Sequence, residues 1–186
     1  ATRALIKAGA NLESKNKDGF TALMSCSQNG HNLCVRALLE AGAAVNHAAA
    51  DGATALMFAC QIGDEQCTLA LLKANANLEA QQNQGYTALM LSCQNGHDRV
   101  ALAMLKAEAA VDAANNAGVT ALMLSASGGH EQCARALLEA GADVNKEGPQ
   151  GYSYLMVACQ CGHTEVSCSA PSPSPSRSLT LSLAAC

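Results

Sequence analysis

Short apolar runs alternate with small and polar stretches along the chain, and they recur at a fixed interval. Each run begins two residues after a glycine, and the five glycines stand 33 residues apart, at Gly19, Gly52, Gly85, Gly118 and Gly151. The run is Thr-Ala-Leu-Met in four copies and Ser-Tyr-Leu-Met in the fifth. A period of this length is typical of stacked units that share one continuous core, because a single unit is too small to bury its apolar face.

The order of residues within one unit predicts helix, turn, helix and loop. Thr21 is placed to cap a first helix of about eight residues, rich in strong helix formers. Gly30 ends this helix because glycine tolerates a positive φ. A second helix is expected over residues 32–41, ended in the same way by Gly42. Residues 43–52 are small and polar, which predicts an extended arm closed by a tight turn.

The period and the order of these columns resemble the ankyrin repeat, whose signature is Thr-Pro-Leu-His. The resemblance extends over roughly residues 1–166. It implies an all-α solenoid of stacked helix-turn-helix units joined by β-hairpin-like arms. In the four Thr-initiated copies, Ala and Met replace the Pro and His of the signature. Polar hydrogen bonds that this histidine usually makes between loops are therefore lost, and methionine fills the same space with an adaptable apolar side chain.

The columns divide the chain into seven segments. Ankyrin repeats are expected at 18–50, 51–83, 84–116 and 117–149, with a partial repeat (second helix and arm only) at 1–17, another partial repeat at 150–166, and a Ser/Pro-rich, disordered tail at 167–186. Because the first partial repeat lacks its first helix, we expect the chain to be a fragment of a longer protein. The tail is either native and follows a truncated repeat, or it marks a departure from the native sequence.

One column near the end of each second helix predicts backbone strain. Gly9, Gly42 and Gly141 occupy it in three units, but Asn75 and Glu108 occupy it in two others. Asparagine adopts the left-handed conformation fairly cheaply, whereas glutamate does not. We therefore expect Glu108 to be strained.

Composition and charge mainly argue against two classes of partner, nucleic acids and membranes. The chain has 49% hydrophobic but only 3% aromatic residues, which suits small side chains between closely stacked helices. Its net charge of −4 argues against an electrostatic grip on nucleic acid or anionic lipid. No apolar run approaches the roughly 20 residues that span a bilayer. Neither nucleic acid nor a membrane is expected as a partner, and the domain is expected to be monomeric.

Most of the ten cysteines exchange with alanine or valine in the repeat columns. Cys60, Cys93 and Cys159 share a column with Ala126, and Cys67 shares one with Val100. This predicts small buried apolar residues in a reducing compartment, the cytosol or the nucleus. Packed helices lie about 8–10 Å apart and a disulfide needs Cα atoms within about 7 Å, so cysteines of one column are not expected to pair.

Metal binding and catalysis find little support in the sequence. His31 and Cys34 have ligand-like spacing, and so do Cys159, Cys161 and His163. Each histidine nevertheless occupies a helix-start column that the repeat uses anyway, and a zinc site needs four converging ligands. No histidine is placed beside a nucleophile and an orienting carboxylate. We expect no catalytic residue, no metal and no cofactor.

Recognition is the function that the resemblance implies. Ankyrin proteins usually hold a protein or peptide at the arm tips, at the residue after the first glycine and on the exposed face of the first helix. Carried over by column, the expected contact residues are Lys17, Asp18, Phe20, Gln28, Asn29, Asp51, Gln61, Ile62, Asn83, Gln84, Tyr86, Gln94, Asn95, Asn116, Val119, Ser127, Gln150 and Tyr152. These columns vary more than the Thr, Leu and Gly columns, as a free surface on a constant scaffold would.

Three of the five aromatic residues, Phe20, Tyr86 and Tyr152, fall in one column, and aromatic side chains are favoured interface anchors. The expected function is therefore a non-enzymatic protein-protein interaction module. One alternative is an accessory domain that recruits substrates for a larger enzyme, such as a kinase or a ubiquitin ligase, whose catalytic part lies outside this chain. Another is a spacer whose exposed columns vary because solvent makes no demands on them.

Overall fold

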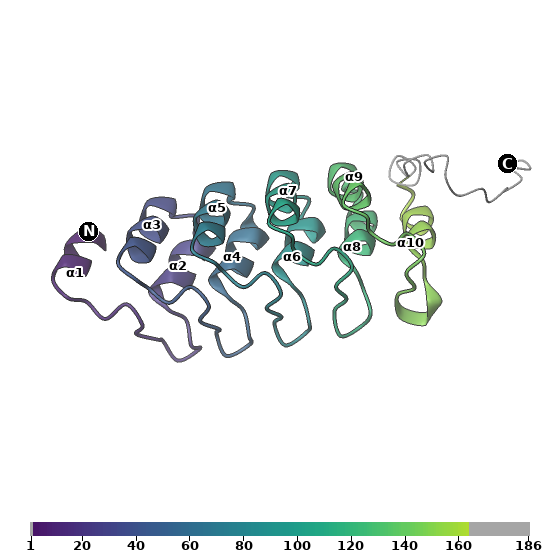
Figure 1. Ribbon diagram of the computed structural model, residues 1–186. Helices are drawn as coiled ribbons and strands as arrows, with labels where there is room; N and C mark the ends of the chain where they lie inside the picture. Colours follow the sequence, from purple (N-terminus) through teal and green to yellow (C-terminus); the bar gives the residue numbers. More distant parts are fainter. Residues whose placement is uncertain (1, 164–186) are drawn as a thin grey trace, which may run out of the picture.

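The computed structural model describes residues 2–163, so the tail expected at 167–186 lies outside the described residues. The described part contains ten α-helices, arranged in two layers (Figure 1). The first layer holds α2 (Ala22–Gln28), α4 (Ala55–Ile62), α6 (Ala88–Gln94), α8 (Ala121–Gly128) and α10 (Tyr154–Gln160). The second layer holds α1 (Thr2–Lys7), α3 (Asn32–Glu40), α5 (Glu65–Lys73), α7 (Asp98–Lys106) and α9 (Glu131–Glu139).

Each helix packs against its neighbours in its own layer, and the pairs α2–α3, α4–α5, α6–α7 and α8–α9 also pack together within their units. The stack is therefore elongated, with α1 and α10 at opposite ends, and the arms project together from one edge (Figure 1). Isolated antiparallel bridges join Ala48 to Thr54 and Ala114 to Thr120, and the last described arm carries a short 3-10 turn, Pro149–Gly151. This arrangement confirms the expected all-α solenoid with hairpin-like arms. Within residues 2–163, no helix has the length and apolar character needed to cross a membrane.

The capping prediction is confirmed in every first-layer helix. The hydroxyl of Thr21 accepts a hydrogen bond from the Met24 amide at 3.4 Å, and Thr54, Thr87 and Thr120 do the same in their units. Ser153 caps α10 in the same way. Each cap satisfies a backbone donor that the first turn of a helix leaves unpaired. The repeated threonine is therefore a structural residue.

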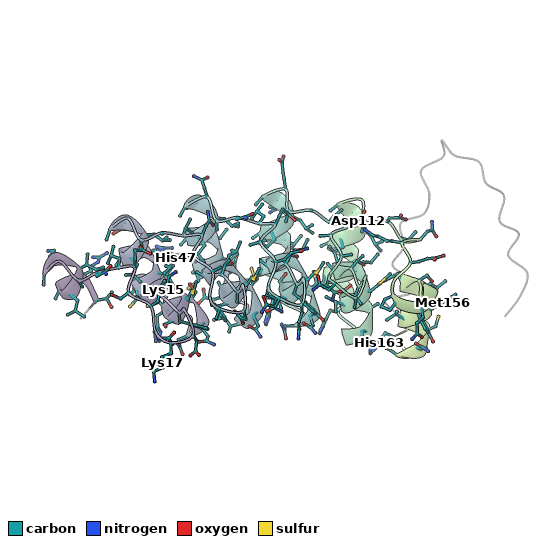
Figure 2. All side chains as sticks on the ribbon, turned by 90° about the horizontal axis from the view of Figure 1, so that it is seen from below. Lys15, Lys17, His47, Asp112, Met156 and His163 are labelled. Atoms are coloured by element: carbon teal, nitrogen blue, oxygen red, sulfur yellow. The ribbon has the colours of Figure 1, made fainter. Side chains whose placement is uncertain are left out.

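The core consists mainly of the Leu–Met pair that follows each cap. From Leu23 and Met24 to Leu122 and Met123, these side chains are almost completely buried between neighbouring units. The same pair in α10, Leu155 and Met156, is 54% exposed at each residue. Met156 lies at the end of the stack opposite Lys15 and Lys17 (Figure 2). Burial of this column therefore depends on a neighbouring unit.

Cysteines take the place of small apolar side chains in the same core. Cys60, Cys67, Cys93 and Cys133 are buried, and all eight cysteines that the structure describes are free. The prediction is wrong for Cys159, which is exposed because no described helix covers that face of α10.

Polar links between units are more numerous than the loss of the signature histidine predicts. The His97 Nε2 lies 3.0 Å from the Gln61 carbonyl oxygen of the preceding unit, and His130 Nε2 lies 3.1 Å from that of Gln94. A second set joins the arms, since Glu13 accepts from the Ala44 amide at 2.8 Å. Asn46, Glu79 and Asp112 each accept in the same way from the next unit. The helix-start histidines and these acceptors therefore provide polar links between neighbouring units.

The strained column behaves as expected. Asn75 has a φ of 57° and Glu108 a φ of 64°, both in the left-handed region. Gln150, with a φ of 58°, is a third such residue. The repeat pattern does not indicate it, because the pattern places the glycine of that turn one residue later, at Gly151.

Candidate functional site

The first four arm tips form a continuous edge because backbone hydrogen bonds tie each of them to the next. The Ala50 amide donates to the Asp18 carbonyl at 2.9 Å, and the Asn83 amide donates to that of Asp51 at 2.7 Å. The Asn116 amide continues the series to the Gln84 carbonyl at 3.1 Å. Side chains on these tips are therefore held at the spacing of the repeat. Such preorganisation lowers the entropic cost of binding.

Most of the expected contact residues lie on the surface. Fifteen are exposed: Lys17, Asp18, Gln28, Asn29, Asp51, Gln61, Ile62, Asn83, Gln84, Gln94, Asn95, Asn116, Ser127, Gln150 and Tyr152. Phe20, Tyr86 and Val119 are half-buried and pack partly against neighbouring residues. The structure does not gather them into one pocket, since they follow the edge of the stack from unit to unit.

Several of the exposed amides already have structural roles. Asn29 Nδ2 donates to the Ser25 carbonyl at 2.7 Å, and Asn95 Nδ2 donates to that of Leu91 at 2.8 Å. Both hydrogen bonds satisfy carbonyls near the end of a first-layer helix. Asn116 Nδ2 donates to the Asn83 carbonyl at 2.8 Å and so links two arm tips. These three side chains have fewer donors free for a partner than the glutamines of the same surface.

Phe20 of the aromatic column packs against a column of the first-layer helices that is not among the expected contact residues. The Phe20 ring lies 5.0 Å from the Phe58 ring, centroid to centroid, with the planes tilted by 41°. Phe58 stands four residues after a capping threonine, and the same column holds Leu91, Leu124 and Val157. Apolar residues at this position, in a column that otherwise varies, are the signal that could have identified it.

We call these two columns together the apolar strip. It consists of the residue after each arm glycine (Phe20, Ala53, Tyr86, Val119 and Tyr152) and the residue four after each cap (Ser25, Phe58, Leu91, Leu124 and Val157). Ala53, Phe58 and Leu91 are buried, so the exposed apolar surface comes from the other members, apart from the polar Ser25. Charged side chains at the described arm tips are confined to the first two tips, at Lys17, Asp18 and Asp51. The surface beside the strip is otherwise amide-rich and uncharged. It is suited to hydrogen bonding and apolar contact.

The strip opens into a groove between α8 and α10. This groove encloses about 330 Å³ and is lined by Val119, Met123, Leu124, Ser127, Pro149, Tyr152, Val157 and Gln160. We call it the Ser127 groove. No charged side chain of the described chain lines it. It is the part of the strip where a partner could insert a side chain.

The cysteines and histidines do not form an alternative site in the described chain. Among residues 2–163, no three His, Cys, Asp or Glu side chains are close enough together to hold a metal ion. Burial raises the pKa of the Cys60 thiol to about 12. Hydrogen bonding to Cys93 and burial likewise raise the pKa of Cys133, whose thiol also donates to Asp98 Oδ1 at 3.1 Å. A raised pKa lowers the fraction of nucleophilic thiolate at neutral pH, so these thiols are structural.

Comparison with known families agrees with this geometry. A family model described as ankyrin repeats (three copies) matches residues 1–49, 44–115 and 104–168. No curated protein matches the chain.

Proposed function

Because the chain belongs to the ankyrin-repeat family, we propose that it is a non-enzymatic module that binds a protein or peptide along its arm tips and apolar strip. Ankyrin repeats are generally protein-protein interaction modules. The repeats are proposed to be complete over 18–50, 51–83, 84–116 and 117–149. The observation that carries the proposal is the ladder of backbone hydrogen bonds between arm tips, which presents variable side chains at a fixed spacing.

The chemistry of this surface favours a polypeptide partner. Exposed amides such as Gln28, Gln61 and Gln94 offer both a donor and an acceptor, as peptide backbone requires. The scarcity of positive charge beside the strip disfavours a phosphate backbone. The free cysteines, four of them buried, favour a reducing compartment, the cytosol or the nucleus.

Capture of partners from a cell lysate by the chain tests this function. We expect Tyr86→Ala to weaken binding of a captured partner by about 1–2 kcal/mol, because an aromatic anchor would be removed. Tyr152→Ala should weaken it similarly. Tyr86 packs partly against the core, so the melting temperature of each variant must first match that of the original chain.

A matched control lies in the second layer of helices. Arg99 on α7 has a side chain that is 84% exposed, and its ion pair with Glu65 at 3.7 Å is a surface contact of small energy. Arg99→Ala should leave affinity unchanged. A partner that is lost with Arg99→Ala but kept with both tyrosine variants would move the binding site to the second layer.

A further inference from the structure

The Ser127 groove lies where one unit departs from the glutamine column of the first-layer helices. The column holds Gln28, Gln61, Gln94 and Gln160, all exposed, but Ser127 in α8. Replacement of a long amide side chain by a hydroxymethyl group leaves space beside α8. In the described chain, the groove lies beside the one member of this column that has a short side chain.

The walls of the groove are apolar and graded in exposure. Met123 is only 3% exposed and forms the floor. Val119, Leu124 and Val157 are half-buried, and Tyr152 is 37% exposed. Covering the remaining apolar surface is favourable in proportion to its area. The groove therefore has room for a side chain and leaves apolar surface in contact with water.

The lack of charged groups in the lining determines which kind of side chain the groove can accept. The lining offers polar atoms only from Ser127, Tyr152 and Gln160, together with backbone, and it contains no ionised group. A charged side chain would lose its hydration there without gaining a counter-charge, which is costly. Gln94 and Gln160 stand one unit to either side of Ser127, where their amides are free to contact peptide backbone.

We propose that the Ser127 groove receives one large, neutral apolar side chain of the bound polypeptide, such as leucine, methionine or phenylalanine. This inference rests on the proposed function and names the residue class that the partner must present. Ser127 and its apolar neighbours then fix the register of the partner along the strip, because Ser127 interrupts a column that holds glutamine in the four other first-layer helices.

The test uses the full chain and a phage-displayed library of random linear peptides. Peptides selected on the original chain are measured against Ser127→Gln, which restores the column and fills the groove, and against Ser127→Ala, which keeps it open. Glutamine is exposed at this position in four other first-layer helices, so Ser127→Gln should fold and melt like the original. The second variant controls for loss of the hydroxyl group.

We expect the selected peptides to share one large neutral apolar residue. Changing that residue to lysine should weaken binding about tenfold or more, and Ser127→Gln should weaken it by a similar factor. Ser127→Ala should stay within about twofold of the original, since it removes no apolar wall.

The remaining outcomes overturn the inference, and they separate it from the proposed function. Peptides that are insensitive to Ser127→Gln but weakened by Tyr86→Ala would remove the groove and leave the binding strip in place. Peptides insensitive to both, or no enrichment over the Ser127→Gln variant, would count against groove and strip together. A dimer of the original chain that dissociates in Ser127→Gln would assign the groove to a second copy. Displacement of selected peptides by a synthetic copy of residues 164–186 would assign it to this chain's own segment.

Discussion

At the scale of single residues, the buried thiols make the stability of the folded chain depend on pH. Cys60 is completely buried, and burial raises the pKa of its thiol to about 12, because a thiolate would lose its hydration. Burial also raises the pKa of Cys67 to about 12, and the nearby Asp64 carboxylate adds to the effect. Both thiols are thus kept protonated by the fold over a range in which an unfolded chain would ionise them.

The free energy of unfolding should therefore fall as pH rises from about 9 towards about 12. The folded-state pKa of Cys60 lies above the ordinary value of 9.0, so the unfolded chain releases this proton first. Stability from this group is complete below pH 9 and is lost through the interval, by up to about 1.4 kcal/mol per pH unit. Urea unfolding at about pH 8 and about pH 10.5 measures the change.

Cys60→Ala is the matched variant, because Ala126 fills the same column elsewhere and is fully buried. Its stability should fall less steeply with pH than that of the original chain. Equal slopes would show that Cys60 ionisation does not limit stability in this range.

Backbone strain at Glu108 gives a second residue-scale prediction. Its φ of 64° is a left-handed conformation that costs a residue with a Cβ roughly 1–2 kcal/mol. Glu108→Gly should raise the free energy of unfolding by about 1 kcal/mol, since glycine adopts this conformation freely. Chemical denaturation measures it. Glu108→Ala retains the Cβ and the strain, so it should gain far less, and a gain equal to that of glycine would attribute the effect to loss of the glutamate charge.

At the scale of elements, the caps keep the short first-layer helices in place. α6 has only seven residues, and isolated helices of this length are unstable in water. The Thr87 hydroxyl accepts from the Met90 amide at 3.3 Å, and Thr87 is buried, so water cannot readily replace the lost bond. The cap therefore adds to the packing interactions that stabilise α6.

Thr87→Ala should lower the free energy of unfolding by about 1 kcal/mol or somewhat more, the usual effect of removing an N-cap. Thr87→Ser should recover most of the loss, because Ser153 makes the same bond to the Met156 amide at 3.4 Å. Thermal unfolding of the three proteins measures the difference. A serine variant no more stable than the alanine variant would mean that the threonine methyl group, rather than the cap, is what stabilises α6.

The elements that could be predicted from the sequence are those set by local interactions. The caps at Thr21 and Thr87 and the left-handed φ of Glu108 depend on residues within one turn, so a repeated motif reveals them. The bond from His97 to the Gln61 carbonyl joins two units, and no local pattern indicates its geometry. The bonds that Glu13 and Asn46 accept also join two units, so they too depend on how the units stack.

The candidate surface was predictable to a similar depth. Exposure of the arm tips follows from the repeat, and the structure places Lys17, Asp51 and Gln84 on the surface. The packing of Phe20 on Phe58 depends on how two units meet, so exposure of the aromatic column could not be inferred from one unit. The Ser127 groove combines a short side chain, where other units carry glutamine, with neighbours from three segments of the chain. Only the three-dimensional arrangement brings these segments together.

At the scale of the whole molecule, stability is shared between neighbouring units. Contacts run from each helix to the next along both layers, so a unit is stabilised mainly by the units on either side. Leu89 on α6 is buried between α4 and α8, whereas Leu155 in the same column of α10 is 54% exposed. Identical residues in one column thus have different surroundings according to their place in the stack.

The same substitution at these two positions should therefore have unequal effects. Leu89→Ala should lower the free energy of unfolding by about 2–5 kcal/mol, since it leaves a cavity in the middle of the stack. Leu155→Ala should cost less than about 1 kcal/mol, because most of the side chain already contacts water. Denaturation followed by circular dichroism compares them directly. Equal losses would mean that residues beyond the described part cover the end of α10, and that the stack continues its core past Leu155.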